Sequence, residues 1–187
     1  MKHLIVAVVL LFAPTALAAA EEIPMWAGVK KTQQMLAADK KLVAEAERLG
    51  GRKRAAARAN ELGWAAIAKG DPNLAIRRFN QAWLLDPENP NTYWGFAVAT
   101  GEQGKPLPVV FEYFGRAERG YSRNKRAMSV LFTDQGKILG KRRMYAEAIL
   151  KFEKALSIDP KNREARRVLV VTALASGDED KARKYAK

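Results

Sequence analysis

Two segments of the chain repeat each other, and this repeat constrains the fold more than any other feature of the sequence. Residues 75–89 read AIRRFNQAWLLDPEN, and residues 148–162 read AILKFEKALSIDPKN. Ala, Ile, Phe, Ala, Asp, Pro and Asn coincide at a constant offset of 73 residues, from Ala75 to Ala148. A repeat of this kind is typical of solenoids, in which each unit buries its apolar face against a neighbouring unit.

The spacing within each copy predicts a helix that ends at a fixed place. Ala75, Phe79 and Ala82 stand at i, i+4 and i+7, and therefore share one helix face. A small Ala lets a neighbouring helix approach closely, and the Phe ring fills the space beside it. Pro87 then ends the helix, because proline has no N–H with which to continue the hydrogen-bond ladder. The second copy has Ala148, Phe152, Ala155 and Pro160 at the same positions.

A partner helix precedes each copy. Residues 60–69 carry Leu62 and Gly63, and residues 131–139 carry Gly136 at the matching place. Each glycine permits a close helix crossing, so each copy and its partner form a helix pair.

In this pattern the chain resembles the tetratricopeptide repeat (TPR) family. The offset is twice the family's period of about 34 residues plus about five more. The usual Trp that opens the motif is absent, because Ala59 occupies that place in the first repeat. The positions that carry the resemblance are Leu62, Gly63, Ala75, Phe79, Ala82 and Pro87, and then Gly136, Ala148, Phe152, Ala155 and Pro160. The resemblance implies an all-α, right-handed TPR superhelix over residues 52–187, with about four repeats, the last of them incomplete.

The first twenty residues differ from the rest. A short positive start, a continuous apolar run from Leu4 to Ala13 and the small residues that follow predict a secretory signal peptide over residues 1–20. Cleavage after Ala18 and cleavage after Ala20 fit equally. The alternative is an uncleaved anchor, which Pro14 and the barely sufficient length disfavour. No later run is apolar enough to cross a membrane, so the sequence predicts a periplasmic protein with no stable span after cleavage.

Two short segments lie between the signal peptide and the repeats. We expect residues 21–31 to be a loose tail, from which Trp26 could tuck into the body of the protein. Residues 32–51 show apolar residues at helical spacing and end in Gly50-Gly51, which predicts a helix that caps the first repeat.

Composition argues against catalysis. The chain has no Cys, and its single His lies in the signal peptide, so thiolate and imidazole chemistry and the usual metal ligands are missing from the mature protein. We therefore expect no enzyme activity, no metal and no cofactor. An enzyme that uses paired carboxylates is the strongly disfavoured alternative.

The resemblance also implies a concave groove lined by the first helix of each pair. Trp64 and Trp94 would face this groove toward one end, and Lys137, Lys141 and Arg167 would face it toward the other. An aromatic surface beside a basic one suits a peptide with apolar anchors and carboxylates. The alternative is that both Trp residues only pack between adjacent helices.

The family's clamp for a terminal carboxylate is absent. The places that would hold its Lys, Asn and Arg side chains are occupied by Asn60, Trp64, Gly95, Val130 and Asp134. A cytosolic chaperone-adaptor role of that kind is therefore disfavoured. The resemblance to small periplasmic TPR proteins instead implies a scaffold or adaptor that binds another protein or peptide in a bacterial envelope, secretion or pilus assembly.

The net charge of +13 leaves a second function open. Basic runs at residues 52–54, 123–126 and 141–143 could bind an anionic envelope polymer or lipid. Nucleic acid is disfavoured, because no recognition motif occurs and aromatic residues are not interleaved with the basic runs.

Overall fold

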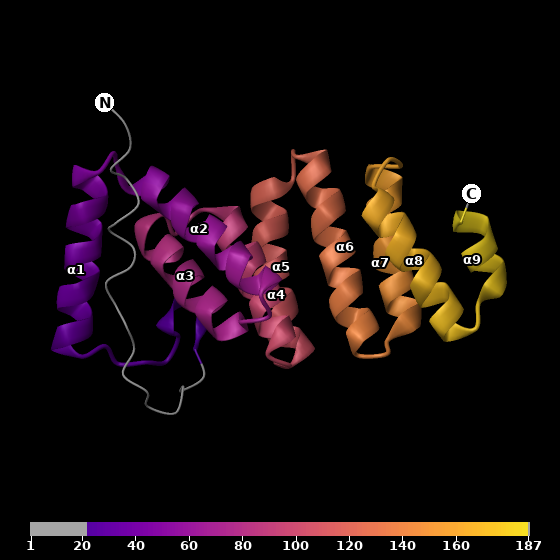
Figure 1. Ribbon diagram of the computed structural model, residues 1–187, viewed down its shortest axis with the longest axis horizontal. Helices are drawn as coiled ribbons and strands as arrows, with labels where there is room; N and C mark the ends of the chain where they lie inside the picture. The colour runs from indigo at the N-terminus through magenta and orange to yellow at the C-terminus, as the bar shows by residue number, and fades with distance from the viewer. Residues whose placement is uncertain (1–21, 187) are drawn as a thin grey trace.

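The computed structural model describes residues 22–186, and all regular elements in that range are helical. They are a single 3-10 turn, η1 (Pro24–Trp26), and the α-helices α1 (Gln33–Arg48), α2 (Arg52–Ala68), α3 (Pro72–Leu85), α4 (Pro90–Glu102), α5 (Leu107–Tyr121), α6 (Lys125–Lys141), α7 (Tyr145–Ile158), α8 (Arg163–Ser176) and α9 (Glu179–Tyr185). The helices follow one another from α1 at one end to α9 at the other (Figure 1). The expected all-α solenoid is confirmed. The predicted signal peptide, residues 1–20, lies outside the described residues.

The helices form four consecutive pairs in two layers. α2 packs on α3, α4 on α5, α6 on α7 and α8 on α9. The first helices of the pairs (α2, α4, α6 and α8) also contact one another in succession, so they form an inner layer. The second helices (α3, α5, α7 and α9) form an outer layer. This arrangement places the faces expected to bind a partner on α2, α4, α6 and α8.

Side-chain caps fix where many of these helices begin. Asp71 accepts a hydrogen bond from the Leu74 N–H, and Asn124 accepts one from the Ala127 N–H. Proline follows the cap at the start of α3 and α4, where a missing N–H has no cost. The sequence predicts where these helices begin, because the capping side chain and the proline that follows it are both local features.

Phenylalanine rings fill the contact between the two helices of a pair, and one of them also reaches the next pair. Phe79 on α3 is fully buried, and a Cβ atom at Gly63 on α2 or at Gly95 on α4 would overlap its ring. Phe152 on α7 has the same relation to Gly136 on α6. The glycines therefore leave the space that each ring fills, as the repeat alignment predicts for Gly63 and Gly136.

The other positions of the repeat pattern divide into buried and exposed ones. Those that face the helix contacts are buried: Ala75, Ala82, Ala148 and Ala155. Leu62 is half-buried, and Pro87 and Pro160 are exposed in the turns that they form.

The segment expected as a loose tail is instead docked on the body. The Met25 N–H donates to Oδ1 of Asn80 on α3 at 2.6 Å, and the Trp26 and Trp83 rings meet edge to face. Trp26 thus tucks into the body, as the sequence allowed, but the docking of the backbone of residues 23–25 was not expected. These contacts join residues more than fifty positions apart, so no local pattern indicates them. α1 lies within the expected range 32–51 and packs against α2 and α3 through Ala46. No helix in the described part is long and apolar enough to cross a bilayer.

Candidate functional site

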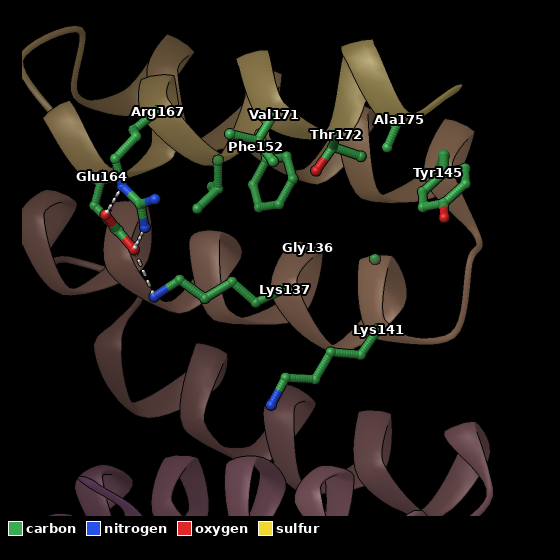
Figure 2. A pocket seen from close by; sticks show the side chains of 12 residues that line it. Gly136, Lys137, Lys141, Tyr145, Phe152, Glu164, Arg167, Val171, Thr172 and Ala175 are labelled. Carbon is green, nitrogen blue, oxygen red and sulfur yellow. Dashed lines mark hydrogen bonds and ion pairs between the residues drawn. The ribbon is translucent and has the colours of Figure 1, made fainter. Parts of the chain in front are cut away.

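A groove of about 540 Å³ lies between the inner helices α6 and α8. Phe152 on α7 and Val168 and Val171 on α8 give it an apolar side (Figure 2). Gly140 places no side chain between α6 and α8; the nearest side-chain atoms would stand 4.0 Å from its Cβ position. The groove is therefore a consequence of small residues on α6 facing valines on α8.

Three of the residues expected to bind a partner border this groove, and each is already paired with a carboxylate. The Lys137 Nζ lies 3.2 Å from Asp134 and 3.3 Å from Glu164. The Arg167 guanidinium donates two hydrogen bonds of 2.9 Å to Glu164 (Figure 2). Lys141 contacts Glu102 on α4 at 2.6 Å. The expected basic surface is thus largely neutralised by carboxylates of the same inner layer.

Burial and pairing shift the pKa values of this cluster in opposite directions. Burial raises the pKa of Asp134, although Lys137 and the Trp94 N–H both favour its charged form. Burial alone would lower the pKa of Lys137, but Asp134 and Glu164 outweigh it, so the pKa is raised. The hydrogen bond from Arg167 lowers the pKa of Glu164. Lys137, Glu164 and Arg167 therefore remain charged near neutral pH.

The two tryptophans lie outside the groove, on the neighbouring inner helices. Their rings meet edge to face, with centroids 5.3 Å apart, and both are half-buried against the main core. The Trp64 Nε1–H donates to Asn91 at 3.0 Å, and the Trp94 Nε1–H donates to Asp134 at 3.0 Å. Both rings thus contribute to packing while keeping part of their surface open. Asp134 links them to Lys137.

The repeat offset explains how the two ends of the inner layer differ. Trp64 and Asn91 stand where Lys137 and Glu164 stand 73 residues later, and both pairs are in contact across the inner layer. The same geometry therefore carries an indole–amide hydrogen bond at one end and an ion pair at the other.

Sequence reasoning missed several residues of the site. Glu164 could have been found by aligning it with Asn91 across the repeat. Val168 and Val171 gave no such signal, because the sequence does not distinguish an apolar residue that lines a groove from one that packs in the core.

Comparison with known proteins supports the fold. The model of the family described as tetratricopeptide repeat matches residues 141–187. No curated protein matched the chain.

Solved structures of similar fold include three proteins, each of low sequence identity. A structure described as "Functional Characterization of Pseudomonas Aeruginosa pilF" is 21% identical with a TM-score of 0.59, over 72% of this chain and 59% of that one. The Arabidopsis OM64 TPR domain is 23% identical with a TM-score of 0.51, over 65% of this chain and 97% of that one. MamA is 21% identical with a TM-score of 0.55, over 81% of this chain and 82% of that one.

These matches and the helix pairs define the class of protein. The chain has an all-α solenoid fold similar to that of tetratricopeptide repeat proteins, and its residues 141–187 match the model of that family. Solenoids of stacked helix pairs present an extended inner surface on which partners bind. The chain spans about three-fifths of the pilF chain, 59%.

Proposed function

We propose that this chain is a protein-interaction module that holds a segment of another protein along its inner layer. The contact residues would be Trp64, Trp94, Lys137, Lys141 and Arg167. The observation that carries the proposal is the open groove between α6 and α8, which lies beside three of these five residues. A concave inner surface with an apolar side and a charged border suits an extended or helical segment.

The charges around the groove indicate what such a segment offers. Because Lys137, Lys141 and Arg167 are each paired, a partner's carboxylate would exchange one ion pair for another and gain little. An apolar side chain placed against Val171, which is 57% exposed, would remove new surface from water. Affinity would therefore come from an apolar anchor, and orientation from the charged border.

A matched pair of variants tests the site. Val171→Lys puts a charge on the apolar side of the groove, whereas Leu150→Lys makes the same kind of change on the outer helix α7, at a side chain that is 64% exposed. Partners captured from envelope extracts by the wild-type chain should bind Val171→Lys at least about tenfold more weakly. Leu150→Lys should retain them. Equal binding by both variants would exclude the groove.

The tryptophans provide a second comparison. Trp94→Ala should weaken partner binding more than Lys141→Ala, since burying an aromatic anchor is worth about 2 kcal/mol and an exposed ion pair under about 1 kcal/mol. Helical content measured by circular dichroism should be kept. If Trp94→Ala melts the fold and leaves residual binding unchanged, the tryptophans are core residues only.

We further propose that the module works in the bacterial envelope, in a secretion or pilus-type assembly. The signal-peptide pattern of residues 1–20 supports export. The similarity in fold to pilF supports this setting by analogy only.

A second candidate function is binding of an anionic polymer or lipid at the turns that precede α2, α6 and α8. These turns lie along one edge of the molecule (Figure 1). Unlike the groove cations, seven exposed basic residues there have no ion pair within the described range: Lys53, Arg54, Arg123, Lys125, Arg126, Lys161 and Arg163. Binding through them would weaken steeply as salt rises, whereas an apolar anchor in the groove would survive moderate salt.

A further inference from the structure

The gap between the outer helices α3 and α5 is occupied by the chain's own residues 22–26. Pro24 is buried there, and Met25 packs against the main core. Arg116 on α5 lies 3.8 Å from the Met25 sulfur, so the segment contacts both helices. In effect a short peptide lies on the surface that α3 and α5 form, and we call this surface the outer groove. The segment's first residue also reaches Gln103 at the end of α4.

Asn80 on α3 holds the backbone of this segment with both ends of its amide. Its Oδ1 accepts from the Met25 N–H at 2.6 Å, and its Nδ2 donates to the Ile23 carbonyl at 2.9 Å. With the segment in place Asn80 has 0% exposure, so the segment's backbone supplies the hydrogen bonds that water would otherwise make. The amide thus offers one acceptor and one donor at the spacing of a peptide backbone.

Further contacts involve the side chains of Glu22 and Trp26 and the carbonyl of Glu22. Arg77 pairs with the Glu22 carboxylate at 3.3 Å, and Gln103 donates to the Glu22 carbonyl at 3.3 Å. The Trp26 ring meets the Trp83 ring edge to face, with centroids 6.5 Å apart. The groove therefore recognises an acidic residue, a proline two positions later and an aromatic residue two positions after that.

The docked segment is strained. Met25 and Trp26 have φ values of 54° and 49°, in the left-handed region that side chains disfavour. A residue other than glycine in this region typically lowers the equilibrium population of its conformation by about fivefold or more. The strain lies at the two residues that contact Asn80 and Trp83, so it weakens the docking of the chain's own segment. A partner segment that reached the same contacts without positive φ would bind more tightly.

We infer that the groove between α3 and α5 is a second peptide-binding site, for an extended segment of a partner protein, and that residues 22–26 occupy it in competition with that partner. The segment it takes has the chemistry of Glu22, Pro24 and Trp26. This site is independent of the inner-layer groove. A tethered competitor has an effective concentration on the order of millimolar, so a partner binds strongly only once residues 22–26 are released.

The test uses full-length chains and a labelled synthetic peptide of residues 22–31, EIPMWAGVKK. Pro24→Asp should release the chain's own segment, because a carboxylate cannot remain in the buried Pro24 position. Trp26→Ala is a second release variant. Fluorescence anisotropy should show the peptide binding both variants at least about tenfold more tightly than the wild type.

Asn80→Leu in the Pro24→Asp background tests the amide contacts with little change in side-chain volume. It should abolish peptide binding, while Gln81→Leu, at a half-buried position beside it on α3, should not. Circular dichroism should show equal helical content in all variants.

Four results would overturn the inference, three of them from the release variants. The first is no peptide binding to either release variant. The second is equal binding with and without Asn80. The third is a release variant that dimerises, as measured by light scattering, and takes no peptide, since the groove would then exchange segments between copies. In the wild type, a Met25 amide that exchanges hydrogen as fast as a free peptide would also refute docking.

Discussion

The Phe79 ring occupies space that two glycines on different helices leave open. Gly63 on α2 and Gly95 on α4 both border it, so one side chain joins the first helix pair to the second. Phe152 meets Gly136 in the same manner. Close packing of this kind leaves little room for relaxation when a ring is removed.

Phe79→Ala and Phe152→Ala should each lower the free energy of unfolding by about 3–5 kcal/mol, because each leaves a ring-sized cavity. Urea denaturation measures this loss. Leu150→Ala, at a side chain that is 64% exposed, is the control and should cost little. A loss below about 1 kcal/mol at both phenylalanines would show that the repeat alignment misidentifies the core.

Asp134 titrates in a setting where burial and hydrogen bonding oppose each other. Its side chain is 18% exposed, and its pKa is raised by burial despite Lys137 and the Trp94 N–H. A raised pKa means that the folded state binds the proton more tightly. The contribution of this group to stability is therefore present below the unfolded pKa and is lost as pH rises through the folded pKa.

Trp94→Phe should raise the Asp134 pKa further, because it removes a donor that favours the carboxylate. Carbon-13 NMR of the carboxyl group, followed against pH, measures the midpoint. In the wild type this midpoint should lie above about 3.9, the ordinary value for Asp. A midpoint that falls in Trp94→Phe would show that the indole does not hold the carboxylate.

At the scale of the helix, Asn162 does more than begin α8. Its Oδ1 accepts from the Ala165 N–H, and its Nδ2 lies 2.8 Å from Ser129 Oγ and 3.1 Å from Thr133 Oγ1 on α6. Ser129 in turn donates to the Ala155 carbonyl on α7. One cap thus connects three helices.

Asn162→Ala should therefore destabilise the protein more than Asn124→Ala, whose side chain accepts only from the Ala127 N–H at an exposed helix start. We expect about 1 kcal/mol for Asn124 and at least about twice that for Asn162, since two buried hydroxyls also lose a partner. Thermal or urea unfolding of the two variants gives the comparison. Equal losses would mean that the contacts to α6 add nothing to the cap.

At the scale of the whole molecule, both predicted cleavage points leave residues 22–26 in the mature chain. The docked segment as described includes Glu22, and the signal-peptide pattern ends at Ala20. Export would therefore deliver a chain that still carries the occupant of its outer groove.

The intact mass of exported protein should correspond to a chain that begins at Ala19 or Glu21. N-terminal sequencing provides the same measurement independently. Membrane-bound protein that retains Met1 would replace the signal peptide with an anchor.

The sequence by itself determined the helix pairs, their order and the glycine and phenylalanine positions that join them. Each of these follows from a local spacing or a turn residue. The 73-residue offset shows that two distant segments repeat the same helical pattern. It also located Lys137, Lys141 and Arg167 on the inner layer by resemblance. The reason is that a helix face depends only on residues three or four positions apart.

Only the tertiary structure decided which charges meet between helices and where the N-terminal segment lies. Lys141 pairs with Glu102 across 39 residues, and Met25 meets Asn80 across 55. Such contacts depend on the position of one helix relative to another, which no local pattern encodes. The pairs Asp134–Lys137 and Glu164–Arg167, by contrast, stand three positions apart on one helix and could have been read from the sequence. The contacts of Lys137 with Glu164, of Lys141 with Glu102 and of the N-terminal segment with α3 could not.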